Sequence, residues 1–149
     1  MPSSLTPFFR AYWRLSRGMT LGVRGIAQDG TGAIMLVRHS YTPGWHLPGG
    51  GVERGETIEA AMRKEFQEEA GIEPISALRI FGMYLNTRFR GDHVVLLQCP
   101  AWRACPTDSQ GEILERGFFP LDRLPPGITT GTRARLAEAL EGAPPSPHW

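Results

Sequence analysis

The feature that most constrains this chain is a glycine-rich turn leading directly into an amphipathic helix. Residues 49–51 are three consecutive glycines, which indicates a backbone that approaches another part of the molecule closely. A helix is predicted over residues 57–70, with Thr57 suited to its N-cap and Gly71 to its end. Its apolar residues recur every four positions and form one face: Ile58, Met62 and Phe66.

The remaining pattern alternates mainly strands with short turns. Strands are predicted at residues 20–28, 33–39, 75–86, 93–101 and 112–119, and a second helix at 130–140. The turn at residues 29–32 favours a hairpin between the first two strands. The continuously apolar run at residues 34–37 indicates a strand buried on both faces. The proline-rich tail, residues 142–149, is expected to be frayed.

A short helix is predicted at residues 7–17, with apolar side chains on one side and three arginines on another. We expect it to pack on the domain or on a second copy of the chain. A membrane-surface helix is the weaker alternative because the segment is so short. The two faces are formed by Phe8, Tyr12 and Leu15, and by Arg10, Arg14 and Arg17.

The length of 149 residues fits a single domain, 1–149. With 16 Lys plus Arg against 15 Asp plus Glu the net charge is +1, so bulk charge gives no reason to expect a stable nucleic-acid complex. Cys99 and Cys105 form no C-x-x-C motif, and a reduced, cytoplasmic setting is expected. The N-terminus is rich in Arg, so an organellar transit peptide is a less favoured alternative. No apolar run approaches the ~20 residues of a membrane span, so no membrane partner is expected.

The predicted helix carries three carboxylates at positions i, i+3 and i+4: Glu65, Glu68 and Glu69. Such positions are neighbours on a helix, and like charges there repel. A bound cation offsets this repulsion, and hard oxygen ligands suit Mg²⁺ or Mn²⁺. The alternative is a solvated acidic face paired with Arg63 and Lys64. The metal interpretation gains from the preceding glycine loop, whose backbone N–H groups can approach phosphate oxygens.

Together the loop and helix resemble the Nudix box, G-x5-E-x7-R-E-U-x-E-E-x-G-U, in which U is a bulky apolar residue. The resemblance spans residues 50–72, and the flanking strands extend it to about 19–140. One position departs from the pattern, since Lys64 stands where the family has Arg. The matching positions are Gly50, Glu56, Glu65, Phe66, Glu68, Glu69, Gly71 and Ile72.

The resemblance implies an α/β (α+β) fold, with a mixed β-sheet sandwiched between helices. It also implies that the three helix carboxylates bind metal, with Glu112 as a further ligand and Glu115 as its competitor. Gly50 would offer its backbone to metal or phosphate, while Glu56 orders the loop and helix start. The family Arg resembles a clamp on a metal-binding Glu. Lys64 keeps its charge but loses its fork, which leaves open a weak or inactive nucleotide-binding or sensor module.

The implied reaction is attack of metal-activated water on a diphosphate in a nucleoside diphosphate linked to another moiety. Glu65, Glu68 or Glu115 would accept the proton. Trp45, Tyr84 or Phe89 are candidates to stack on a base, and His46 is the histidine expected to face the site. The partner is thus a small nucleotide, and a homodimer is possible. Three arginines are candidates to clamp phosphate: Arg38, Arg88 and Arg90.

Overall fold

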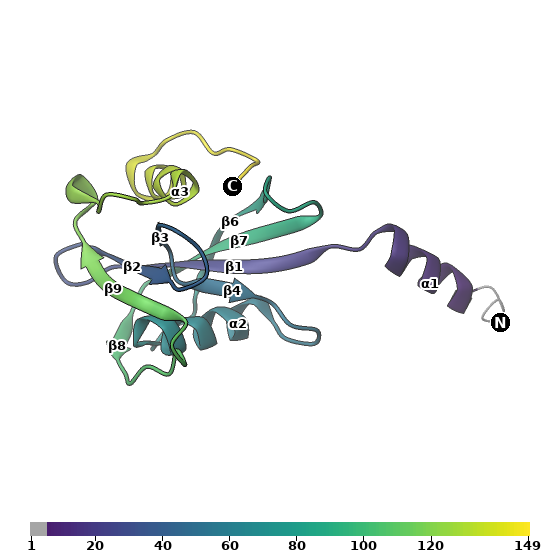
Figure 1. Ribbon diagram of the computed structural model, residues 1–149, viewed down its shortest axis with the longest axis horizontal. Helices are drawn as coiled ribbons and strands as arrows, with labels where there is room; N and C mark the ends of the chain where they lie inside the picture. Colours follow the sequence, from purple (N-terminus) through teal and green to yellow (C-terminus); the bar gives the residue numbers. More distant parts are fainter. Residues whose placement is uncertain (1–5) are drawn as a thin grey trace.

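The computed structural model describes residues 6–149, which fold into a mixed sheet core with helices on both sides (Figure 1). The helical elements are α1 (Thr6–Ser16), α2 (Ile58–Glu65), the π-helical turn η1 (Phe66–Ala70), the short η2 (Leu121–Arg123) and α3 (Thr130–Glu141). The strands are β1 (Thr20–Ala27), β2 (Ile34–His39), β3 (Trp45–His46), β4 (Gly49–Gly51), β5 (Ile72–Pro74), β6 (Arg79–Leu85), β7 (Asp92–Cys99), β8 (Trp102–Ala104) and β9 (Ile113–Phe119).

The strands form three sheets, ordered β4-β1-β7-β6, β3-β2-β9 and β5-β8. β1 pairs in parallel with β7, while its other neighbour β4 and the β6–β7 pair are antiparallel. α2 lies on one side of the strands and α3 on the other (Figure 1). The expected α+β fold, a mixed sheet between helices, is therefore confirmed.

Two buried clusters hold these layers together. One joins α2 and η1 to the sheets, and the other joins the sheets to α3 and the C-terminal tail. In β2, Met35 belongs to the α2 side, whereas Ile34 and Leu36 belong to the α3 side. Alternate side chains of a strand point to opposite faces, so the predicted strand buried on both faces is confirmed.

The predicted hairpin between the first two strands is wrong. β1 and β2 lie in different sheets, and only an isolated bridge between Gln28 and Ile34 links their ends. The turn itself forms, since Asp29 accepts hydrogen bonds from the backbone N–H groups of Thr31 and Ala33 at 2.9 and 3.0 Å. β1 instead pairs with β4 and β7, distant segments that turn chemistry does not specify.

The predicted helix over residues 57–70 is confirmed, with a change of geometry at its end. Thr57 caps the start, accepting a 3.1 Å bond from the backbone N–H of Ala60. Gly71 ends the helix with φ +66°, a left-handed conformation that glycine adopts readily. Between them, η1 is a π-helical turn. A Cβ on Gly25 would lie 2.3 Å from the Phe66 ring, so this glycine lets the helix pack directly on β1.

The C-terminal tail is ordered against the body, contrary to the expected fraying. Leu85 donates its backbone N–H to Pro147 at 2.8 Å, and Trp149 donates to Leu85 at 3.0 Å. The Trp149 ring meets Tyr84 edge to face at 5.7 Å. The Ser146 backbone N–H donates to the buried Glu138 at 2.8 Å. The partners on β6 are more than 60 residues from the tail in sequence, so the tail composition does not reveal them.

The N-terminal helix forms over nearly the predicted residues but does not pack on its own domain. α1 projects away from the body at the start of β1 (Figure 1). All of its residues from Pro7 onward are exposed, so packing on the same domain is excluded. No helix in residues 6–149 is long and apolar enough to cross a membrane.

Candidate active site

The centre of the candidate site is the contact between β4 and the end of α2. Gly50 pairs with Val23 of β1, and a Cβ added to Gly50 would lie 2.4 Å from Oε1 of Glu65. The Glu65 carboxylate therefore rests directly against the Gly50 backbone, and a side chain at position 50 would displace it. The structure thus brings together two residues that the sequence analysis assigned to one site.

Glu69 is buried and hydrogen-bonded at both carboxylate oxygens. Its Oε1 lies 2.8 Å from Nε2 of His39 on β2, and its Oε2 accepts the backbone N–H of Gly49 at 3.0 Å. Its side chain is only 5% exposed. Buried carboxylates need such partners, so Glu69 connects the helix end to both β2 and β4. His39 is likewise buried, so this contact is part of the interior.

The three helix carboxylates are not equivalent, although their helical spacing predicted that they share one face. Glu68 is exposed, Glu65 is half-buried and Glu69 is buried. The π turn from Phe66 to Ala70 is the physical reason, because it alters the spacing of side chains around the helix. Burial, and then the nearby charges of Glu69 and Glu68, raises the pKa of Glu65 to about 7.

The donor set fits a divalent ion in part. Glu65, Glu68 and the backbone of Gly50 are hard oxygen donors at one place, and the charge on Glu65 is disfavoured without a cation. Within residues 6–149, however, no three His, Cys, Asp or Glu side chains by themselves converge into a metal-holding group. Glu69 is committed to His39 and Gly49.

Lys64 lies against Glu56 and not against one of the three helix carboxylates. Its Nζ is 3.1 Å from Oε1 of Glu56, whose Oε2 accepts the backbone N–H of Glu53 at 3.0 Å. Lys64 thus stabilises the loop before α2, through the residue expected to order that loop. Arg63 cannot substitute for it, because its guanidinium binds Glu59 and the carbonyl oxygens of Pro74 and Ser76.

A cavity of about 1010 Å³ lies near the candidate site, although Glu65, Glu68 and Glu69 do not line it. Arg24 lines it and donates to the Leu47 carbonyl at 2.8 Å. Burial lowers the pKa of Arg24, and the opposing field comes mainly from Glu69, with Glu65 contributing. Arg24 therefore connects the cavity electrostatically to the carboxylates. The cavity is lined by loop 86–89, α3 and the tail, including Tyr41, His46, Arg88, Phe89, Thr130 and Ser146.

Sequence reasoning did not identify Arg24 or Tyr41 as site residues. In β1, Arg24 stands between the buried residues Val23 and Gly25. A charged residue inside a predicted strand was the sequence signal that could have identified Arg24 as a site residue. Burial raises the pKa of Tyr41, and the charges of Glu69, Glu112 and Glu65 raise it further. Glu112, directly before β9, therefore acts on the same region as the helix carboxylates.

His46 faces the cavity, in line with the sequence expectation. Burial lowers the pKa of His46 to about 4, so its ring is neutral at pH 7. Its Nε2 lies 3.0 Å from the Pro43 carbonyl oxygen, to which the neutral ring can donate. Phe89 is 66% exposed and also lines the cavity, whereas Tyr84 is buried and donates its hydroxyl to Glu138 at 3.0 Å.

Other predicted substrate residues lie outside this cavity. Arg38 is paired with Glu115 at 3.1 Å. The arginine expected to clamp phosphate and the carboxylate considered as an alternative to Glu112 therefore bind each other. Trp45 packs edge to face on Phe119 at 4.8 Å and belongs to the core beneath α3. Arg90 is exposed in the loop before β7 and does not line the cavity.

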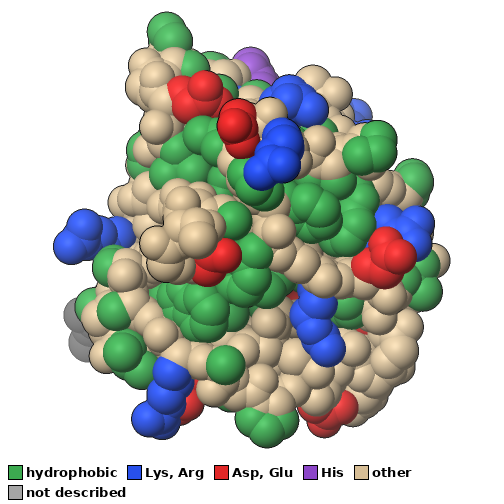
Figure 2. Space-filling view, turned by 90° about the vertical axis from the view of Figure 1, so that its left-hand side faces the viewer, with side chains coloured by type: hydrophobic (Ala, Val, Ile, Leu, Met, Phe, Trp, Pro, Cys, Tyr) green, Lys and Arg blue, Asp and Glu red, His purple; other side chains and the backbone are tan. Residues whose placement is uncertain are grey.

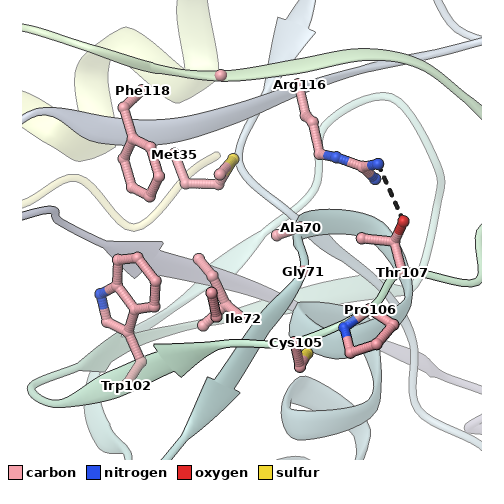
Figure 3. A pocket seen from close by; sticks show the side chains of 12 residues that line it. Met35, Ala70, Gly71, Ile72, Trp102, Cys105, Pro106, Thr107, Arg116 and Phe118 are labelled. Atoms are coloured by element: carbon pink, nitrogen blue, oxygen red, sulfur yellow. Dashed lines mark hydrogen bonds between the residues drawn. The ribbon is translucent and has the colours of Figure 1, made fainter.

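A second, smaller cavity of about 510 Å³ lies beside the end of η1 (Figure 3). Arg116 donates to the Glu69 carbonyl at 3.1 Å and to the Thr107 hydroxyl at 2.9 Å. Trp102 and Phe118 stack at 5.5 Å. None of the predicted site residues lines this cavity, and its arginine serves to hold the helix end.

Comparisons with known proteins identify the family. A family model described as NUDIX domain matches residues 18–140. A MutT-like protein from Streptomyces ambofaciens is 28% identical over 127 residues, covering 85% of this chain and 80% of the relative. An 8-oxo-dGDP phosphatase from Mus musculus is 37% identical over 116 residues. That match covers 74% of this chain but 34% of the relative, so the chain spans about a third of that protein.

Solved structures show the same fold. A MutT Nudix hydrolase from Burkholderia pseudomallei superimposes with a TM-score of 0.69 at 24% identity, covering 80% of this chain and 97% of the other. A UDP-X diphosphatase superimposes with a TM-score of 0.57 at 21% identity, covering 93% and 72%. The family match begins directly after α1 and includes the whole glycine loop and helix. The chain belongs to the Nudix family, whose members hydrolyse pyrophosphate bonds.

Proposed function

We propose that this chain is a metal-dependent hydrolase that cleaves the phosphoanhydride bond of a nucleoside diphosphate linked to another moiety. The observation that supports this most is the position of Arg24, which lines the large cavity and lies in the field of Glu69 and Glu65. Arginine is well suited to bind phosphate oxygens. A diphosphate bound by Arg24 would therefore lie beside the carboxylates.

Nudix hydrolases generally use divalent metal ions, and we assign Glu65, Glu68 and the Gly50 backbone to hold Mg²⁺, with Mn²⁺ as a substitute. When bound, the ion supplies an activated water and neutralises charge on the diphosphate. Glu112 is a further candidate ligand, because its charge acts on Tyr41 together with the charges of Glu69 and Glu65. Glu69 would have to give up a bond to His39 or Gly49 to join them. We therefore assign Glu69 a positioning role.

The chain's own residues supply the remaining functions. Arg24 and Arg88 line the cavity and would bind phosphate oxygens, while Phe89 offers a ring on which a base can stack. Glu65 or Glu68 would accept the proton of the attacking water. The printed names of two similar proteins, an 8-oxo-dGDP phosphatase and a UDP-X diphosphatase, point to nucleoside-diphosphate substrates and so support this class. The proposal treats residues 1–149 as a single Nudix domain.

The alternative of an inactive sensor module rested on Lys64, and no contact favours it. Lys64 needs to reach only one oxygen of Glu56, because the other accepts the Glu53 N–H. The ammonium group of Lys64 can make this single contact, so the planar guanidinium of an arginine is not needed here. We expect Lys64→Arg to change kcat/KM by less than about twofold, since Arg keeps the charge that pairs with Glu56 and this contact needs no bidentate fork. A large gain in rate would revive the account in which the missing fork impairs turnover.

The decisive experiment is turnover with and without metal. The full chain is incubated with Mg²⁺ or Mn²⁺ and a panel of nucleoside triphosphates, nucleoside diphosphates, sugar nucleotides, ADP-ribose, dinucleotides and CDP-alcohols. We expect metal-dependent release of phosphate-containing products from nucleoside-diphosphate derivatives. Glu65→Gln should lower kcat by at least about 100-fold. Glu59→Gln is the matched control on the same helix, because Glu59 pairs with Arg63 on another side.

Two outcomes would contradict the proposal. One is nucleotide binding without metal-dependent turnover on any member of the panel, which favours the sensor module. The other is an equal loss of activity in Glu65→Gln and Glu59→Gln, which would mean that the effect is on helix stability and not on the site.

A further inference from the structure

The helix α1 presents a large apolar face to solvent. The apolar side chains of α1 lie on one side of the helix, since each residue turns by about 100°. They do not contact the body of the domain. Trp13 also lies beneath the Arg17 guanidinium, 5.7 Å from its ring centre. The exposed fractions are 70% for Phe8, 46% for Phe9, 59% for Tyr12, 49% for Trp13 and 88% for Leu15.

The other side of α1 is purely cationic. Arg10, Arg14 and Arg17 fall within an arc of about 60° at 100° per residue. The chain has no acidic residue before Asp29. This differs from the face of the molecule opposite α1, where Lys/Arg and Asp/Glu side chains are both present and in places lie next to each other among hydrophobic patches (Figure 2).

The body adds to this surface where α1 joins it. Thr20 donates its backbone N–H to Gly91 at 3.0 Å and its hydroxyl to Asp92 at 2.7 Å, which holds the end of loop 87–91 beside the start of β1. That loop carries the exposed Arg90, whereas its Arg88 and Phe89 line the cavity. Arg90 therefore adds a further positive charge where α1 joins the body.

We propose that α1, together with Arg90 of the adjacent loop, binds an anionic lipid surface, and that α1 lies within its interface. An amphipathic helix with Arg on one face and Trp, Phe and Leu on the other is suited to the boundary between headgroups and acyl chains. No helix in the described chain can span a bilayer, so α1 would lie on the surface. The negative headgroups match a helix whose charged residues are all arginines. This goes beyond hydrolysis and does not depend on it.

A second copy of the chain is the other occupant to consider. The remaining exposed apolar strand is β6, with Ile80 and Met83 exposed by 61% and 59%. That strand also carries the exposed Arg79. Packing the apolar face of α1 on this strand would leave the arginines of α1 without an anionic partner, whereas an anionic surface neutralises them. Charge complementarity therefore favours lipid over a copy of the same chain.

The test is sedimentation of the full chain with phosphatidylcholine vesicles containing 30% phosphatidylglycerol, against pure phosphatidylcholine vesicles. We expect binding only to the anionic vesicles, and release as salt is raised. Arg10→Gln combined with Arg14→Gln should lower the affinity by roughly 25-fold, about fivefold for each Arg near a charged surface. Phe9→Gln combined with Trp13→Gln removes two of the apolar side chains and should abolish binding. The matched control, Arg79→Gln with Ile80→Gln on β6, should bind as the parent does.

Fluorescence gives a second readout on the same samples. Anionic vesicles should shift the tryptophan emission to the blue, and Trp13→Phe should remove that shift while keeping most of the binding. The proposal is overturned if the parent chain does not sediment with anionic vesicles, or if the β6 control loses binding equally. It is also overturned if light scattering shows a dimer that Phe9→Gln with Trp13→Gln dissociates, without vesicle binding, because the apolar face would then serve a second copy.

Discussion

Gly49 and Gly50 are adjacent, yet the structure requires each of them for a different reason. A Cβ on Gly49 would lie 2.0 Å from the Val23 carbonyl oxygen, which is fixed backbone in β1. A Cβ on Gly50 would meet the end of the Glu65 side chain, which can move aside. The first glycine therefore allows the strands to pair, and the second allows a carboxylate to reach the backbone.

Alanine at these two positions should separate stability from activity. We expect Gly49→Ala to lower the free energy of unfolding by about 2 kcal/mol or more, because the clash is with backbone. Gly50→Ala should cost less than about 1 kcal/mol but lower metal affinity and kcat, since Glu65 is displaced. Denaturant unfolding and metal titration measure the two effects. Equal stability losses in both variants would contradict the distinction.

Glu65 also predicts a pH dependence of the metal-free chain. Its pKa of about 7 lies above the ordinary value of 4.5, so the folded state binds its proton more tightly than the unfolded state does. This contribution to the free energy of unfolding is fully present below pH 4.5 and is lost as pH rises through 7. The full shift corresponds to about 3 kcal/mol, and solvent screening at this half-buried carboxylate makes the contribution smaller. Mg²⁺ affinity should instead rise over pH 6–8, because the ion competes with that proton.

Denaturant unfolding across this pH range, with Glu65→Gln as the comparison, measures the effect. The variant cannot ionise at this position and should show a flatter profile. A parent profile that is as flat as that of the variant would contradict the raised pKa.

At the scale of elements, the tail and α3 form one unit. Glu138 pairs with Arg135 at 2.8 Å in the interior and accepts the Ser146 N–H. The Arg135 guanidinium lies 4.4 Å from the centre of the Tyr84 ring and 5.7 Å from that of Trp149. The tail therefore covers a buried ion pair while its last residues line the cavity.

Trp149→Ala should expose this ion pair and destabilise the chain. We expect a loss of about 2–3 kcal/mol, somewhat below that of a fully buried tryptophan, because Trp149 is half-buried. KM should rise more than kcat falls, since the tail lines the cavity and does not touch the carboxylates. Trp102→Ala, in the other cavity, is the comparison. A similar rise in KM in that variant would show that the effect is not local.

Across the whole molecule, local patterns predicted elements better than partners. The helix with its Thr57 cap and Gly71 end, and the doubly buried run in β2, were readable because neighbouring residues determine them. The pairing of β1 with β7, and of the tail with Leu85, depends on segments more than 60 residues apart. The site followed the same division. Gly50 and Glu65 share one motif, whereas Arg24 joins them only through the pairing of β1 with β4.

Removal of residues 1–17 should leave the stability of the remaining chain nearly unchanged. α1 is exposed throughout the part whose side chains are described, and the family match begins at residue 18. Thermal unfolding should differ from that of the full chain by no more than about 2 °C, which corresponds to less than 1 kcal/mol for a domain of this size. A large drop would mean that α1 contacts the body, contrary to its position in Figure 1.

The π turn at Phe66–Ala70 has a consequence for how this gene tolerates small deletions. Such turns correspond to one residue added to an α-helix, so loss of the single codon for Gln67 would restore ordinary α-helical winding. The helix would still begin at Thr57 and end at Gly71. Residues beyond the turn would keep their direction, because the π turn had absorbed the extra residue. Glu68 and Glu69 lie inside the turn, so their side chains would change direction and the Glu69 carboxylate would no longer reach His39 and Gly49. An in-frame codon loss could thus leave a folded product without catalytic activity.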